Sequence, residues 1–314
     1  MPLKASAPGS LMLLGEYAVL HGKQALVCAV DKRIQVILTP RSDKKIEIDS
    51  SLYGHYSTDL MQLKIEKPFQ FVLGALQQYQ AKLRYGCNIN ITSEFSDKVG
   101  LGSSAAVTVA TLATLVSWLN IRMSPLELVR QGRNVIRLIQ GTGSGADIAA
   151  SVYGGIVAYQ AQPMFAEKFN ILHPLTVLYA GFKTPTVEAI KTVQQSFSGY
   201  STLFRHLTNS IGQCATDGIQ LVRRMEWAKL GEMMNIQQGM MESLGVNTLL
   251  LADMIQDLRR QANMLGAKIS GSGFGDCVIG LGELPADYTY RGDHQGVQRI
   301  HVNMTAQGVH CEKI

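Results

Sequence analysis

The chain has 314 residues, and its hydrophobic content of 46% with a charged content of 17% is enough to fill real cores and argues against intrinsic disorder. Its net charge of +5 comes from 29 basic and 24 acidic residues that are spread thinly, without a basic run or a basic stripe interleaved with aromatic residues. This distribution argues against nucleic-acid binding, and the length predicts about two domains.

The cysteines are odd in number and none of them forms a C-x-x-C pair, which indicates free thiols in a reducing compartment rather than disulfides or a zinc site. They are Cys28, Cys87, Cys214, Cys277 and Cys311. Residues 1–9 lack the charged lead and apolar stretch of a secretory signal. The longest apolar segment, residues 105–119, is too short to cross a bilayer. We therefore expect a buried helix there and a cytoplasmic protein that does not bind membranes.

Hydrophobic spacing in the first half of the chain predicts a mixture of strands and helices. β-Branched and alternating segments predict strands at residues 26–38, 44–49, 87–92 and 156–159. Helical spacing predicts helices at residues 69–83, 103–119, 125–139 and 147–152. Ser124 is the expected N-cap of the third of these helices, with Pro125 as its first residue.

The second half begins with a strand and continues with long helical patterns. Strands are predicted at residues 175–179, 267–269, 277–281, 301–304 and 309–313. Helices are predicted at residues 187–195, 201–225, 228–244 and 248–264. Because strands and helices are mixed in both halves, we expect an α/β or α+β fold with two domains, residues 1–160 and 161–314.

A glycine-containing loop opens the predicted helix at residues 103–119. It reads Gly100-Leu101-Gly102-Ser103-Ser104-Ala105-Ala106. Glycines permit close backbone approach, and the first turn of a helix has unpaired N–H groups and a partial positive charge, so the segment suits a phosphate. Its serines can cap the helix or supply a hydroxyl to a metal-bound nucleotide. An ordinary Gly/Ser helix start is the alternative, and the loop lacks the lysine of the P-loop pattern.

Two more glycine loops place polar groups at the ends of predicted elements. Residues 141–147 (GTGSGAD) end in Asp147, which either caps the following helix or acts as a general base toward a hydroxyl. Residues 268–277 (KISGSGFGDC) join two predicted strands, as a hairpin or as a close backbone approach. Near the N-terminus, Glu16 interrupts an apolar, strand-like run, and a carboxylate there needs partners unless it lies on a surface turn.

These segments follow one another in an order that resembles the GHMP superfamily of small-molecule kinases, from Pro8 to Gly282. Within it the chain is similar to the mevalonate kinase family: APGSLMLLGEYAVLHGKQAL resembles the first motif, GLGSSAAVTVA the second, and GTGSGADIAASVYGG the stretch with the catalytic aspartate. MNIQQGMMESLGVNT and LGAKISGSGFGDCVIGL resemble the later helix and the third motif. The resemblance implies an α+β GHMP kinase fold, with an N-terminal α/β domain, a C-terminal α+β (ferredoxin-like) domain and the active site between them.

The resemblance also implies substrates and residue roles. ATP would bind against Gly100, Leu101, Gly102, Ser103, Ser104 and Ala105, with Ser104 on Mg²⁺. Asp147 would face the primary hydroxyl of mevalonate and take its proton or orient it, and the products would be 5-phosphomevalonate and ADP. The substrate side would be lined by Glu16, Tyr17, Thr186 and Ser272. Dimers are common in this family, so a homodimer is a further expectation.

Three places depart from the family pattern, one of them being the proline and glycine ahead of Gly100, where residues 97–99 read Asp-Lys-Val. The lysine of the first motif, which interacts with the catalytic aspartate and the transferred phosphate, is replaced by Ser10. A metal-binding glutamate, expected eleven residues before Asp147, is replaced by Ile136. Because phosphoryl transfer depends on neutralising charge, we hypothesise that Lys183 or Lys268 supplies the missing cation and that Glu16 takes over metal binding. The alternative is that both lysines are solvated surface residues.

Three other functions stay open. Phosphomevalonate kinase also fits GEYAV and GDC, but its substrate would require extra basic residues at the substrate end of the cleft. Candidates for these are Lys32, Arg33, Arg133 and Arg137. A sugar kinase of the same superfamily would start its first motif with Gly-Glu-His, which is absent here. A catalytically inactive relative that binds nucleotide or metabolite is consistent with Ser10 and Ile136, whereas Asp147 and the intact second motif argue against it.

Overall fold

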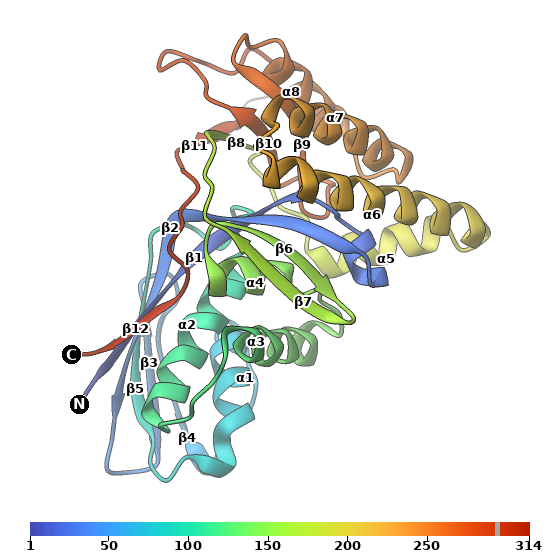
Figure 1. Cartoon of the computed structure of the whole chain (residues 1–314). Helices are drawn as coiled ribbons and strands as arrows, with labels where there is room; N and C mark the ends of the chain where they lie inside the picture. The colour runs from blue at the N-terminus through green and yellow to red at the C-terminus, as the bar shows by residue number, and fades with distance from the viewer. Residues whose placement is uncertain (293–295) are drawn as a thin grey trace.

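The computed structural model describes residues 1–292 and 296–314, which fold into two halves, each a sheet covered by helices (Figure 1). The first half holds an eight-stranded sheet in the order β12-β1-β2-β5-β3-β4, with β6 paired to β2 and β7 to β6. Only β3 and β5 pair in parallel within it. The strands are β1 (Leu3–Leu14), β2 (Gln24–Pro40), β3 (Lys45–Ser50), β4 (Gly54–Asp59), β5 (Cys87–Ser93), β6 (Ile156–Ala161), β7 (Met164–Phe169) and β12 (His310–Lys313).

Helices cover one face of this sheet (Figure 1). They are α1 (Gln70–Tyr79), α2 (Ser103–Trp118), α3 (Pro125–Gln140) and α4 (Ala146–Tyr153). α2 packs directly on β1 and β2 and is covered in turn by α1, α3 and α4. A helix enclosed on all sides has to be apolar around its whole circumference, and this explains the long run of alanine, valine and leucine in α2. The predicted buried helix at residues 105–119 is thereby confirmed.

The second half contains a four-stranded antiparallel sheet in the order β11-β8-β10-β9. Its strands are β8 (Leu175–Tyr179), β9 (Met264–Ser270), β10 (Cys277–Gly282) and β11 (Gln298–Ile300). Its helices are α5 (Thr186–Ser196), α6 (Ser201–Arg223), α7 (Trp227–Ser243) and α8 (Leu249–Arg259). α7 and α8 pack on β9, while α6 lies between α7 and β2 of the large sheet. α6 therefore joins the two halves.

The end of β1 also crosses from one half to the other. The residues that follow it, Tyr17 and Ala18, belong to the hydrophobic core of the second half. Close by, the Met12 amide donates a hydrogen bond of 3.0 Å to the Ser270 hydroxyl at the end of β9. Strand β1 and the glycine loop at residues 268–277 are thus brought together at the boundary between the halves. The domain limit at residue 160 stays a prediction, and the β6–β7 pair lies across it.

Most predicted elements are present, and the exceptions lie toward the C-terminus. The helix expected at residues 248–264 ends at Arg259, because Met264 begins β9 and pairs with Gly282 of β10. Residues 301–304 form no strand, apart from one bridge between Met304 and Val30. The strand in that region is β11, and β4 and β7 were also not predicted. The Ser124 cap is confirmed, since its hydroxyl accepts a 3.2 Å hydrogen bond from the Glu127 amide.

Within residues 1–292 and 296–314, no helix is both long and apolar enough to cross a membrane. The five cysteines are free thiols, and all except Cys311 are buried.

Candidate active site

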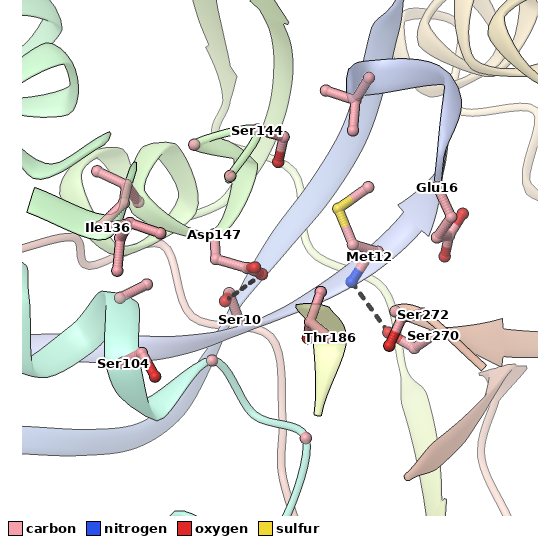
Figure 2. A pocket seen from close by; sticks show the side chains of 18 of the residues that line it. Ser10, Met12, Glu16, Ser104, Ile136, Ser144, Asp147, Thr186, Ser270 and Ser272 are labelled. Atoms are coloured by element: carbon pink, nitrogen blue, oxygen red, sulfur yellow. Dashed lines mark hydrogen bonds between the residues drawn. The ribbon is translucent and has the colours of Figure 1, made fainter. Parts of the chain in front are cut away.

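A cavity of about 190 Å³ lies where the two halves meet (Figure 2). Its walls come from β1 and the turn after it, the start of α2, the end of α3, the start of α4, the segment at residues 183–190 and the β9–β10 loop. Of the residues predicted to bind nucleotide, metal or substrate, all but Leu101 line this cavity, and so do Asp147 and Lys183, whereas Lys268 does not. The Leu101 side chain is fully buried, and its carbonyl accepts a 3.0 Å hydrogen bond from the Ser10 amide. Leu101 thus anchors the loop to β1 instead of facing a ligand.

The start of α2 presents free backbone amides to the cavity. Its N-cap is Gly102, which has φ 68°, and no side chain caps the first turn. Ser103, Ser104 and Ala105 follow along the cavity wall. An uncapped N-terminus of a 16-residue helix carries unpaired N–H groups and a partial positive charge, so this wall suits a phosphate group.

Asp147 stands in the first turn of α4, whose N-cap is Gly145. The aspartate does not cap its own helix. Instead, its Oδ1 accepts a 2.8 Å hydrogen bond from the Ser10 hydroxyl (Figure 2). Burial raises the pKa of Asp147, while the Ser10 hydrogen bond and the positive charge of Lys183 oppose this rise. The geometry thus provides a desolvated carboxyl group at the cavity wall, as general-base chemistry requires.

Among the described residues that line the cavity, Lys183 is the one with a cationic side chain. It lies on the segment between β8 and α5, and its Nζ donates to the Asp97 carbonyl at 3.3 Å, across from the second half to the first. Its charge acts on Asp147. Of the candidates for a phosphorylated substrate, none lines the cavity. These are Lys32, Arg33, Arg133 and Arg137.

Lys268 does not face the cavity. It is fully buried, and its Nζ bonds to the Glu16 carboxylate and to the Ile269 carbonyl. The other carboxylate oxygen of Glu16 accepts a hydrogen bond from Gln237, which also binds the Gly15 amide at 2.9 Å. Both oxygens of Glu16 are therefore engaged by protein groups, and a metal-binding role for Glu16 stays an untested prediction.

Three hydroxyl groups expected on the substrate side lie at the cavity wall, those of Tyr17, Thr186 and Ser272. The Tyr17 hydroxyl donates a 2.6 Å hydrogen bond to the Ser272 carbonyl. Burial, with a smaller contribution from Glu16, raises the pKa of Tyr17, so it remains a neutral donor. Tyr17 has φ 60°, a conformation that non-glycine residues rarely adopt.

Asp276, in the β9–β10 loop, is a cavity residue that sequence reasoning missed. Burial raises its pKa to about 6, against the positive charge of Lys183 and a hydrogen bond from the Gly100 amide. Its carboxyl group lies against Gly100, where a Cβ atom would be 2.1 Å from Oδ1. The signal in the sequence was an acidic residue inside a glycine-rich loop, but only the tertiary structure brings it to the start of α2.

These residues fit a magnesium nucleotide. The uncapped start of α2 can receive phosphate oxygens, the Ser104 hydroxyl stands beside it, and Asp276 Oδ1 is buried with no hydrogen-bond partner in the described part of the chain. No group of three or more His, Cys, Asp or Glu side chains among the described residues is arranged to hold a metal. Magnesium commonly binds through one or two carboxylates together with phosphates and waters, so a protein cage is not required.

Comparisons with known proteins agree with this geometry. Residues 70–155 match the family described as GHMP kinases N terminal domain, and residues 219–289 match GHMP kinases C terminal. Mevalonate kinase from Thermococcus sibiricus is 30% identical over 299 residues, which cover 90% of this chain and 89% of that protein.

Solved structures share the whole fold. The Lin0012 protein from Listeria innocua superposes with a TM-score of 0.86 at 21% identity and covers 100% of both chains. Galactokinase from Lactococcus lactis, complexed with galactose, gives a TM-score of 0.79 at 17% identity and covers 98% of this chain and 95% of its own. At these identities the likeness shows the fold, with its N- and C-terminal domains, and leaves the substrate open.

Proposed function

The chain belongs to the GHMP kinase superfamily, and from this premise we propose that it transfers the γ-phosphate of ATP to the primary hydroxyl of mevalonate, giving 5-phosphomevalonate and ADP. The mevalonate kinase of Thermococcus sibiricus, which matches this chain over 89% of its own length, supports this substrate. In this reaction the bond between the β,γ-bridging oxygen and the γ-phosphorus breaks, and a new bond forms between the hydroxyl oxygen and the γ-phosphorus. The hydroxyl group loses its proton, and ADP is the leaving group.

One observation carries the proposal: the Asp147 carboxyl group and the uncapped start of α2 line the same cavity. The amides at residues 102–105 would hold the phosphates, and Asp147 would accept or orient the hydroxyl proton. Lys183 would neutralise negative charge on the transferred phosphate, which in the family is the task of the first-motif lysine that Ser10 replaces. Bound Mg²⁺ supplies further charge neutralisation, and Ser104 is a residue suited to hold it.

The remaining wall supports a small, branched aliphatic substrate with a single anionic group. Val19, Leu20 and Ile190 are apolar and line the cavity. A substrate that already carries a phosphate would need cations beyond Lys183, and none is present among the described lining residues. This composition favours mevalonate over phosphomevalonate.

The direct test measures ADP release with Mg·ATP and mevalonate, phosphomevalonate or galactose in turn. We expect turnover with mevalonate at least tenfold above the other two, and a loss on the order of 10²-fold or more in kcat for Asp147→Asn. Preference for another acceptor would reassign the substrate. Nucleotide binding without turnover on any of the three would favour an inactive relative, which is the reading that Ser10 and Ile136 support.

A further inference from the structure

Asp276 sits in an unusual backbone conformation beside the phosphate-binding wall. It has φ 72°, although it is not a glycine, and it follows Gly271, Gly273 and Gly275, which also have positive φ. Such a conformation costs about 1–2 kcal/mol in a residue with a side chain, and residues of this kind cluster at functional sites. A glycine would be the unstrained choice here, although aspartate tolerates this region better than most residues with a side chain.

The backbone of Asp276 fixes the carboxyl group in place. Its amide donates to the Phe182 carbonyl and its carbonyl accepts from the Ala180 amide, both at 2.8 Å. These bonds tie the residue to the segment that carries Lys183. On the other side the carboxyl group touches Gly100, just before α2, which leaves no room for a side chain at that position. The carboxyl group thus lies between the segment that carries Lys183 and the glycine loop that precedes α2.

Three carboxyl groups line the cavity, those of Glu16, Asp147 and Asp276. Both oxygens of Glu16 already accept bonds, from Lys268 and Gln237. Oδ1 of Asp147 accepts from Ser10, and the Asp276 carboxyl group accepts from the Gly100 amide. Of the three, only Asp276 has a buried oxygen without a hydrogen-bond partner in residues 1–292 and 296–314. Because Asp276 lines the cavity, its carboxyl group places an unsatisfied oxygen beside the loop that precedes α2.

The charges at the wall make a cation necessary. Lys268 balances Glu16, which leaves one lysine against two aspartates among the described lining residues. A triphosphate brought to this wall would meet an unbalanced carboxylate next to Gly100, and the repulsion would be strong in a site of low dielectric. A divalent ion between the carboxylate and the phosphates removes the repulsion.

We propose that Asp276 is a ligand of the divalent cation that accompanies the nucleotide. It would take over the role of the family glutamate that Ile136 replaces. The inference rests on the proposed use of Mg·ATP. Ile136 is apolar and buried, and its side chain cannot bind an ion. Asp276 supplies the carboxylate from the opposite half of the molecule, and Ser104 and phosphate oxygens supply further oxygen ligands.

The test compares ADP binding with Mg²⁺ and with EDTA by isothermal titration calorimetry, in the wild type, Asp276→Asn and the control Asp97→Asn. Asp97 lies near the same loop but does not line the cavity. We expect the ratio of metal-free to metal-bound Kd to fall at least tenfold in Asp276→Asn. Metal-free ADP should bind this variant as tightly as the wild type or more tightly, because the repelling charge is gone. Asp97→Asn should keep the wild-type ratio.

An unchanged ratio in Asp276→Asn would overturn the proposal. A wild-type protein that binds ADP equally with and without Mg²⁺ would overturn it as well. The titrations contain no acceptor alcohol, so their results do not depend on whether mevalonate is the substrate. A readout on the wild type covers the case in which the variant does not fold: Fe²⁺ with ADP, ascorbate and peroxide should cleave the chain beside residue 276, and cleavage beside Glu16 instead would contradict the proposal.

Discussion

Ser10 stands where the resemblance expects a lysine, and its hydroxyl donates to the Asp147 carboxylate at 2.8 Å. This bond stabilises the charged form of Asp147 and so opposes the rise in pKa caused by burial. The substitution of lysine by serine therefore preserves a donor to the aspartate, although it removes a charge.

Ser10→Ala should move the acid limb of the kcat/KM profile to higher pH. Loss of the hydrogen bond removes a contribution that lowers the pKa of Asp147, so the pKa rises and a more alkaline solution is needed to keep the base ionised. The measurement is kcat/KM against pH for wild type and variant. Ser151→Ala is the matched control, because Ser151 is a buried serine of α4 that bonds the Pro8 carbonyl. An acid limb at the same pH in Ser10→Ala would contradict this account.

Lys183 is the residue we expect to carry the charge that Ser10 lacks. Lys183→Met should lower kcat on the order of 10²-fold, because a cation near the developing charge is lost. Lys183→Arg should recover part of the rate. Lys191→Met serves as the control, since Lys191 is an exposed lysine on α5 that does not line the cavity. Near-normal turnover of Lys183→Met would show that the site works without this cation.

At the scale of elements, the start of α2 depends on a close approach between Gly102 and β1. A Cβ atom at Gly102 would lie 2.3 Å from the Ser10 hydroxyl oxygen, and the φ of 68° also disfavours a side chain. The turn before α2 therefore has little freedom to accommodate other residues.

Gly102→Ala should weaken ADP binding tenfold or more, because the loop must move away from β1 and its amides lose their alignment. Calorimetric Kd values for ADP and the unfolding temperature test this. Gly54→Ala is the control, since Gly54 has φ 74° with no atom within 4 Å of an added Cβ. Gly54→Ala should lose about 1 kcal/mol of stability from backbone strain, Gly102→Ala should lose at least as much because of its added clash, and only Gly102→Ala should lose affinity. Equal affinities in the two variants would argue against a nucleotide at this loop.

The sequence predicted elements well where local signals mark their ends. Ser124 and Pro125 located the start of α3, and Gly102 marked the start of α2. The helix at residues 248–264 was drawn too long because Met264 fits an apolar helical face as well as a strand, and its pairing with β10 is a tertiary effect. The short edge strand β11 lacked a periodic pattern of its own.

The candidate site divides in the same way. Glycine-rich loops, such as the one ending in Asp147, could be located from the sequence. The contacts of Lys268 and Asp276 could not be predicted, because they are made between the two halves. Lys268 reaches Glu16, and Asp276 reaches Gly100, over long sequence separations that no local pattern encodes. The resemblance gave the order of motifs but said nothing about which buried charges pair.

At the scale of the whole molecule, a buried ion pair links the two halves. Lys268 of β9 and Glu16 after β1 have side chains that are 0% and 2% exposed. Removing both charges from water is costly, and their mutual attraction offsets this cost only while both are present. Burial lowers the pKa of Lys268, whereas Glu16 opposes that shift. Breaking the pair from one side would leave an isolated charge in the interior.

Lys268→Met should therefore destabilise the protein by about 3–5 kcal/mol, and Lys268→Met with Glu16→Gln should cost clearly less than the sum of the two single changes. Denaturant unfolding of all four proteins measures this coupling. A second cycle on Arg223 and Glu167, whose side chains are 42% and 35% exposed, is the control, and we expect a coupling of only about 0–1 kcal/mol there. Additive effects at the buried pair would mean that the halves do not depend on it.

The same cycle separates stability from function. Glu16 and Tyr17 line the cavity, whereas Lys268 does not, so Lys268 can affect the acceptor only by holding the turn after β1 in position. At temperatures where the variant remains folded, Lys268→Met should raise the KM for the acceptor several-fold and leave the Kd for ADP near the wild-type value. The amides proposed to bind phosphate belong to α2, whereas the Lys268 ammonium group bonds to Glu16 and Ile269. If ADP affinity fell together with acceptor affinity, the two halves would be coupled through more than this ion pair.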